Sequence, residues 1–272
     1  IRTLKLIGTQ AFKYIQTKCY EKNLTFDPKN VTVDFEISIH NAVLSIWPST
    51  NLIGCRFHLT QAWYRKIQEL GLTTEYKKNW WLRTTFGLTF LDPQEVSDSF
   101  VDDFMSLIPE ESAYYKYADY LTDNYISENS VFPPTLWSNF SASKSRTTNN
   151  CESFHAHFNE QFYKSHPHIN TFLKILISNV QNNVYIQINS CNVGVQKPVR
   201  CNIKKQVIKT TNAIDEYKSK TISRMTFLKK TTHADGPGFR PGSSPRSFRR
   251  SVNRPLPGSR TGSARLRHAR QV

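Results

Sequence analysis

Residues Val31–Leu72, VTVDFEISIHNAVLSIWPSTNLIGCRFHLTQAWYRKIQELGL, contain short apolar runs and polar residues in a regular order. A β-branched run predicts a short strand over Asn30–Phe35. An amphipathic segment over Ile37–Trp47 predicts a helix, which Pro48 ends because proline cannot continue helical hydrogen bonding. The first half of the stretch is therefore expected to fold as a strand followed by a helix.

The second half of the stretch repeats this order. Leu52–Phe57 predicts a second buried strand that carries Cys55, and His58 follows directly after it. A helix is expected next, with Gly71 as a suitable residue to end it. The apolar face of that helix consists of Leu59, Trp63, Ile67 and Leu70. This sequence of elements favours an α/β fold.

Three carboxylates are candidates for catalysis. Asp34 lies at the carboxyl end of a predicted strand, where enzymes often place metal ligands, and Glu36 is a weaker case of the same kind. Glu152 lies near a predicted helix start within TTNNCESFH (residues 147–155). Position alone favours ordinary turn and capping roles for all three residues.

Cys55 and His58 form half of a spacing that is typical of zinc sites. A structural zinc site needs four ligands, and no other cysteine or histidine pair has a suitable spacing. The remaining candidates are Cys151, His155, His157, His166 and His168. The spacing alone favours a packed cysteine and a hydrogen-bonded histidine over a zinc site.

The composition indicates a polyanionic partner. The formal net charge is +15 and the isoelectric point is about 9.6, which suits nucleic acid, although a basic surface without a partner is the alternative. The five cysteines are odd in number and widely separated, which argues against a disulfide framework and for a reducing compartment. No apolar run approaches the roughly 18 residues of a membrane span, so no membrane partner is expected.

The rest of the chain is predicted to be mostly helical. Helical spacing of apolar residues covers residues 1–22, most of 75–140, and the segments 149–163 and 172–188, whereas 195–230 predicts short helical or extended pieces. The aromatic residues of the second of these regions form either a core or a base-stacking surface, and their helical spacing favours a core. They include Trp80, Trp81, Phe86 and Phe90.

The composition changes abruptly at residue 231. Residues 231–272 contain nine Arg, no Lys, five of the ten Gly and five of the thirteen Pro, which predicts a disordered basic tail. Such a tail is either an arm that binds phosphates or a translated flank without a selected role. The shift from Lys to Arg, Gly, Pro and Ala favours the flank.

Several of these motifs together resemble the transposase domain of Mutator-like elements (MULE), which belongs to the DDE superfamily. The first block of the resemblance includes residues 33–36 (VDFE), 47–48 (WP), 54–58 (GCRFH) and 71–72 (GL), with Ala42, Gln61 and Ala62 in register between them. The second block is residues 148–155 (TNNCESFH). The resemblance spans about residues 1–230.

The resemblance implies an RNase H-like core that holds two Mg²⁺ or Mn²⁺ ions for DNA strand cleavage and transfer. Asp34 and Glu152 would be the second and third catalytic carboxylates and metal ligands. Cys55 and His58 match a family motif whose role the motif leaves open, with zinc as a lesser alternative. The implied partners are transposon ends and target DNA, within a homo-oligomeric transposition complex in the nucleus.

The resemblance also implies the organisation of the chain. Residues 1–74 would be a partial RNase H-like core, 75–140 a helical insertion, 141–230 the carboxyl-terminal part of the core with the helix that bears Glu152, and 231–272 the disordered tail. The first catalytic Asp should precede the helix at 1–22 on strands that this sequence lacks. We therefore expect an incomplete core that is inactive alone. The alternative is a non-catalytic nucleic-acid-binding or interaction protein derived from a transposable element.

Overall fold

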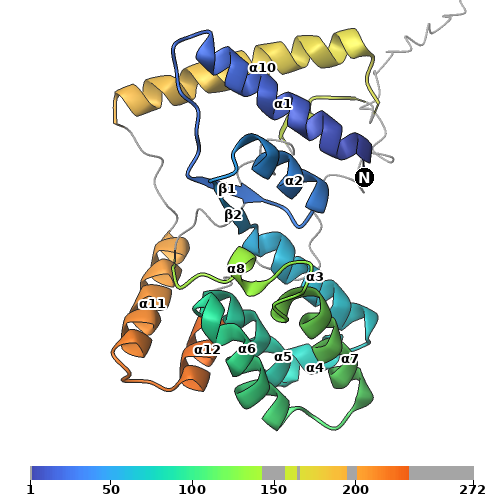
Figure 1. Cartoon of the computed structure of the whole chain (residues 1–272), viewed down its shortest axis with the longest axis vertical. Coiled ribbons are helices and arrows are strands. Elements are labelled where there is room, and N and C mark those ends of the chain that lie inside the picture. Colours follow the sequence, from blue (N-terminus) through green and yellow to red (C-terminus); the bar gives the residue numbers. More distant parts are fainter. Residues whose placement is uncertain (1, 143–156, 164–165, 195–200, 233–272) are drawn as a thin grey trace, which may run out of the picture.

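Two short parallel strands, β1 (Asn30–Val33) and β2 (Asn51–Gly54), form the only sheet among the described residues (Figure 1). The computed structural model describes residues 2–142, 157–163, 166–194 and 201–232. The strands pair in register from Asn30 opposite Asn51 to Val33 opposite Gly54. The rest of the described chain is mainly helical, so the predicted α/β class is confirmed in its coarse form.

Helices α1 (Arg2–Tyr20) and α2 (Ile37–Ile46) pack together beside the sheet. A small apolar cluster joins them to the strands, with Val33, Val43 and Trp47 buried at its centre. The side chains around this centre are Phe12, Val31, Ile39, Ile46 and Leu52. The helices predicted over 1–22 and 37–47 are confirmed. Phe12 is the α1 side chain in this cluster, whereas Ile7, Tyr14 and Ile15 of the predicted apolar face are exposed.

The second strand is shorter than predicted. It ends at Gly54, and α3 (Arg56–Glu69) begins directly after Cys55. The Cys55 amide still donates to the Val33 carbonyl at 2.7 Å, whereas its carbonyl already accepts from the Leu59 amide at 3.1 Å. The prediction of a strand through residue 57 is wrong because Cys55 turns the chain from strand pairing into helical hydrogen bonding.

Residues 73–137 form a helical part built from short pieces, as predicted for most of 75–140. The regular helices are short, and they are joined by 3₁₀ and π-helical turns. In order they are α4 (Thr73–Lys78), α5 (Trp80–Thr84), η1 (Thr85–Phe90), η2 (Pro93–Glu95), α6 (Val96–Ser99), η3 (Phe100–Phe104), η4 (Met105–Leu107), α7 (Ser112–Leu121), η5 (Thr122–Ile126) and α8 (Pro134–Trp137).

Aromatic side chains fill the core of this helical part. Trp63 of α3 meets Phe86, Tyr125 and Trp137 edge to face, with ring centroids 5.4–5.8 Å apart. Such edge-to-face contacts add to the stabilisation from apolar burial. Trp81, Phe86 and Phe90 are also buried. The core interpretation of these aromatics is confirmed for the buried side chains, which are inaccessible to a nucleic acid base.

Three helices follow: α10 (Ile169–Asn192), α11 (Cys201–Lys218) and α12 (Arg224–Thr232). The long helix α10 contains the predicted 172–188 helix. None of the described helices is both long enough and apolar enough to cross a membrane. α11 and α12 pack as a hairpin (Figure 1). α12 also lies against η1 and α5 of the helical part.

The junction between α12 and the helical part is tight. A Cβ atom at Gly87 would lie 2.7 Å from the Leu228 carbonyl oxygen, so only glycine permits this approach. Thr231 is buried and α12 continues to Thr232, which corrects the predicted tail boundary at residue 231. The other predicted domain boundaries stay predictions, and the predicted disorder of 233–272 lies outside the described residues.

Candidate metal centre

The carboxyl ends of β1 and β2 bring two predicted site residues to one edge of the sheet. Asp34 directly follows β1, and Cys55 directly follows β2. Because the strands are parallel and Val33 pairs with Gly54, both residues leave the sheet side by side. Functional groups gather at this edge in α/β proteins because the polypeptide leaves every parallel strand there.

His58 completes a three-residue cluster. It lies in the first turn of α3, and its Nδ1 atom is 2.7 Å from the Asp34 Oδ1 atom. The candidate ligand atoms of Asp34, Cys55 and His58 all lie within 4.8 Å of one another. Cys55 is buried, whereas the side chains of His58 and Asp34 are 29% and 47% exposed. The cluster therefore has a closed side at the sulfur and an open side at the carboxylate.

The surrounding residues hold Asp34 and its neighbours in place. His40 of α2 contacts the Asp34 carbonyl oxygen through Nε2 at 2.6 Å. The Phe35 ring packs edge to face against Phe132 at 5.1 Å and crosses close to Gly54. His40 also meets the Phe132 ring. The strand end that bears Asp34 is thus fixed by contacts on two sides. His40 was not predicted to belong to this arrangement, because no spacing pattern in the sequence indicates it.

The first turn of α3 is tied to the helical part as well. The Arg56 Nε atom donates to the Thr89 hydroxyl at 3.0 Å, and the guanidinium lies 4.1 Å from the centroid of the Phe90 ring. Arg56 lies between the two candidate ligands Cys55 and His58 in the sequence. Its contacts therefore anchor the turn from which both candidate ligands project.

The donor atoms of the cluster are one carboxylate oxygen, one imidazole nitrogen and one thiol sulfur. Among the described residues, no second carboxylate joins Asp34. Glu36 precedes α2, and its carboxylate accepts a hydrogen bond from the Ser38 hydroxyl at 2.6 Å. Mg²⁺ and Mn²⁺ favour oxygen ligands. Asp34 can supply one such ligand, but the cluster cannot supply the further oxygen ligands that these ions require.

The other predicted ligands do not reach this cluster in the described part of the chain. Glu152, Cys151 and His155 lie outside the described residues. His157 lies 3.7 Å from Glu160 in an exposed pair. His166 and His168 are exposed and belong to no described metal-type cluster. The structure thus brings together Asp34, Cys55 and His58, and leaves the pairing of Asp34 with Glu152 a prediction.

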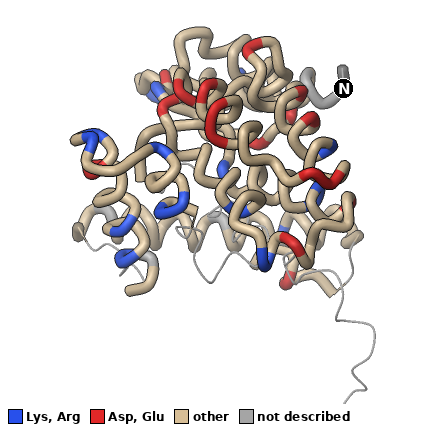
Figure 2. The backbone as a smooth tube through the Cα atoms, turned by 90° about the horizontal axis from the view of Figure 1, so that it is seen from below, with Lys and Arg blue, Asp and Glu red and all other residues tan. Residues whose placement is uncertain are grey.

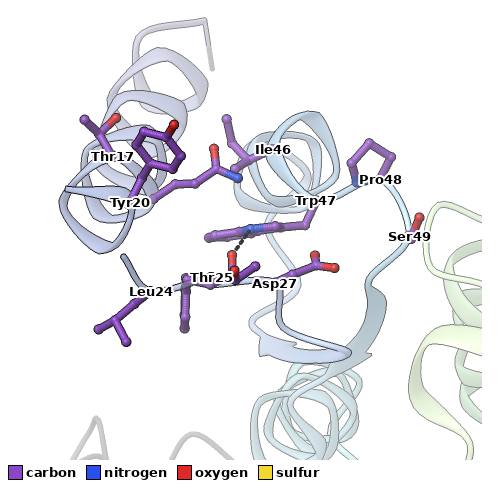
Figure 3. Close-up of a pocket in the computed structure, with 11 residues that line it drawn as sticks. Thr17, Tyr20, Leu24, Thr25, Asp27, Ile46, Trp47, Pro48 and Ser49 are labelled. Atoms are coloured by element: carbon purple, nitrogen blue, oxygen red, sulfur yellow. Dashed lines mark hydrogen bonds between the residues drawn. The ribbon is translucent and has the colours of Figure 1, made fainter. Parts of the chain in front are cut away.

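A hollow of about 540 Å³ lies at the opposite end of α2 (Figure 3). Its wall includes Tyr20, Asp27 and Trp47, and the Trp47 indole donates to the Phe26 carbonyl at 3.0 Å. A ten-residue helix is about 15 Å long, so α2 separates this hollow from Asp34. The hollow therefore takes no part in the metal-type cluster.

Charge is strongly segregated along the chain (Figure 2). Residues 92–128 contain ten acidic residues and one Lys, whereas 201–232 contain eight basic and two acidic residues. The two regions meet through Arg224, which pairs with Asp102 and Asp103. Near this junction, burial and hydrogen bonding to Glu95 raise the pKa of Tyr217 to about 12. The α11–α12 hairpin is therefore basic and packs against an acidic part of the chain.

Comparison with known proteins provides no relative for this chain. No family model, no curated protein and no solved structure matches it.

Proposed function

We propose that this chain is part of a DDE-type DNA transposase in which Asp34 is one of the catalytic metal ligands. The position of Asp34 carries the proposal: its carboxylate is half exposed and follows directly after a strand that pairs in parallel with β2. At the carboxyl end of parallel strands, such a group can hold a cation and still face a substrate. The order of motifs that resembles MULE transposases supports the same role.

Bound divalent ions in this reaction class activate a water or a DNA 3′-hydroxyl and stabilise the leaving oxygen of the phosphoryl transfer. Asp34 would supply one carboxylate ligand to such an ion, and Glu152 would supply another. His40 and the Phe35 ring keep the Asp34 backbone fixed, so that the carboxylate is positioned before an ion arrives. Positioning of this kind is the main contribution that protein residues make to phosphoryl transfer.

Iron-directed cleavage tests the proposed carboxylate pair without requiring catalytic activity. Fe²⁺ takes the place of Mg²⁺, and ascorbate with peroxide then cuts the polypeptide near the bound ion. We expect cuts near Asp34 and near Glu152 in the full chain, and loss of the cut near Glu152 in Asp34→Asn. Cys19→Ser, at a cysteine outside the Asp34–Cys55–His58 cluster, is the control and should keep both cuts. Cutting near Glu152 that is unchanged by Asp34→Asn would overturn the carboxylate pair.

A second candidate function, non-catalytic binding of nucleic acid, is favoured by the solvent face of α11. Lys204, Lys205 and Lys209 are exposed there and form no ion pair with a described residue. The opposite face of the helix is buried through Thr210, Ala213 and Ile214. The lysines therefore stand on a packed helix that presents them to solvent, which suits contacts with a phosphate backbone.

Lys218 and Lys220 extend this basic surface at the end of α11, and Lys229 of α12 lies 4.4 Å from the centroid of the Trp80 ring. Asp215 is the one exposed acidic residue of the hairpin, whereas Glu216 is half-buried and paired with Lys230. Both candidate functions need DNA contacts of this kind. Only the transposase proposal needs Asp34 and Glu152, so the iron-directed cuts near these two residues, and not DNA binding, separate the two candidates.

A further inference from the structure

We infer that Asp34, Cys55 and His58 form a binding site for Zn²⁺. The inference goes beyond the proposed transposase function, because it assigns a soft-metal site that includes two residues for which the catalytic scheme has no role. It uses only described residues and does not require Glu152. The observation behind it is the convergence of three different ligand atoms, from two strand ends and one helix turn, within 4.8 Å.

The distances fit zinc after a small adjustment. Zinc lies about 2.0–2.3 Å from nitrogen, oxygen and sulfur ligands in tetrahedral geometry, which places a nitrogen and an oxygen ligand about 3.3 Å apart. The His58 Nδ1 and Asp34 Oδ1 atoms now lie 2.7 Å apart. A bound ion therefore requires these two atoms to separate by about half an ångström. The half-exposed Asp34 side chain can make this movement, since it is not enclosed by the core.

The type of donor atoms selects the metal. A thiolate and an imidazole are preferred by Zn²⁺ and related transition metals, whereas Mg²⁺ and Ca²⁺ require oxygen ligands. Cys55 directly precedes the 14-residue helix α3, so its sulfur lies beside the first helical turn, which carries His58. His58 is three residues further on, which places both side chains on the same side of the first turn.

The cluster has the ligand count of an open zinc site. Three protein ligands leave one position of a tetrahedral ion for water, and the exposed side of Asp34 gives that position access to solvent. Zinc bound here would engage the Asp34 carboxylate and compete with Mg²⁺ or Mn²⁺ for it. This competition rests on the proposed function, whereas zinc binding itself does not.

Metal titration of the full chain tests the site. After metal removal, we expect one Zn²⁺ or one Co²⁺ to bind per chain, and the bound Co²⁺ to show thiolate-to-metal charge-transfer absorption. Cys55→Ser should abolish that absorption and weaken Zn²⁺ binding at least about tenfold. Cys19→Ser and Cys201→Ser are matched controls, since neither cysteine belongs to the cluster, and both should bind as the unmodified chain does.

Two further variants keep the test decisive if Cys55→Ser, which changes a buried residue, fails to fold. Asp34→Asn alters a half-exposed side chain and should also weaken Zn²⁺ binding at least about tenfold, whereas Glu152→Gln should leave it unchanged. Bound Co²⁺ without charge-transfer absorption, or unchanged Zn²⁺ affinity in Asp34→Asn, would overturn the inference. If the unmodified chain binds zinc but shows no iron-directed cut near Glu152, that result would count against the transposase proposal alone.

Discussion

The Nδ1 atom of His58 lies 2.7 Å from the Oδ1 atom of Asp34, although the two residues belong to different strand–helix units. This contact joins the end of β1 to the start of α3. We therefore expect Asp34→Asn and His58→Gln to be coupled in their effects on the free energy of unfolding. Because both side chains are partly exposed, the coupling should be about 0.2–1 kcal/mol.

Urea unfolding of both single variants and the double variant measures this coupling. Lys66→Gln with Glu69→Gln is the control cycle, because that exposed pair has the same 2.7 Å separation within one helix. A double variant whose loss of stability equals the sum of the single losses would show that the Asp34–His58 contact contributes nothing in solution.

The space beside Gly54 supplies a second prediction. A Cβ atom at this position would lie 2.6 Å from the Cζ atom of Phe35, whose ring is packed against Phe132 and Tyr125. We expect Gly54→Ala to lower the free energy of unfolding by about 1–3 kcal/mol because the ring has little room to shift. The same displacement should weaken metal binding, since Phe35 is the neighbour of Asp34.

Gly8→Ala serves as the control for this substitution. Its Cβ atom would lie 3.2 Å from the Ala42 Cβ atom, a tight contact, but alanine also favours the helix at this position by about 0.5–1 kcal/mol. Thermal and urea unfolding should therefore show a smaller effect than at Gly54. Equal losses in the two variants would mean that the Phe35 ring moves aside readily.

Some of the candidate site was predictable from sequence, and some of it was not. The end of a β-branched run identified Asp34, and the Cys-x-x-His spacing identified Cys55 and His58. Their convergence depends on the parallel pairing of β1 with β2, which joins residues about twenty positions apart and leaves no periodic signal. His40 was not predicted either, because its side chain contacts the Asp34 backbone carbonyl and such a contact leaves no pattern in the sequence.

The helical part shows a different limit. Its aromatic core was predictable from spacing, but its division into short 3₁₀ and π-helical turns was not. The Thr85 and Thr89 hydroxyls donate to carbonyls three residues earlier, which stabilises tight turns between Trp80 and Phe90 in place of one longer helix. Helices α11 and α12 gave a weak signal because they have few apolar residues and acquire their packing from η1 and α5.

The lysine face of α11 predicts salt-dependent DNA binding. We expect the double variant Lys205→Glu, Lys209→Glu to bind duplex DNA more weakly, and the slope of log affinity against log salt concentration to become shallower by about 2. Fluorescence anisotropy at several salt concentrations measures both quantities. The double variant Lys78→Glu, Lys116→Glu makes the same charge change at exposed positions outside the hairpin. Equal losses in the two double variants would indicate a response to net charge alone.

Tyr217 predicts how stability changes at high pH. Its hydroxyl donates to Glu95 at 2.8 Å, and burial together with this hydrogen bond raises its pKa from 10.0 to about 12. Between these values the folded chain holds a proton that the unfolded chain has lost, so the free energy of unfolding falls as pH rises. Burial also raises the pKa of Tyr117 and of Tyr125, which adds to the same trend.

Tyr217→Phe should make the decline of stability between pH 10 and pH 12 less steep, because the phenylalanine has no proton to lose. Urea unfolding at several pH values across this window measures the slope. Tyr163→Phe, at a fully exposed position, should leave the slope unchanged. A Tyr217→Phe slope equal to that of the unmodified chain would show that this hydroxyl does not titrate with unfolding.

Arg224 predicts how α12 is held against the acidic helical part. Its guanidinium pairs with Asp103 and lies 3.3 Å from Asp102, and Asp103 also accepts from the Ser99 hydroxyl at 3.0 Å. Arg224→Met keeps much of the apolar stem but leaves two neighbouring carboxylates without their cation, so we expect a loss of about 1–3 kcal/mol. Arg224→Lys should lose less, because it keeps the charge but not the planar donor geometry.

Hydrogen exchange locates this effect, because loss of the anchor should speed exchange of the α12 amides more than exchange of α2, which packs with α1 in a separate cluster. Lys230→Met is the matched control, since it removes a pair with Glu216 within the α11–α12 hairpin and leaves Asp102 and Asp103 untouched. Faster exchange in α2 and α12 alike would mean that Arg224 supports the whole fold, and the hairpin would then not be a separately anchored unit.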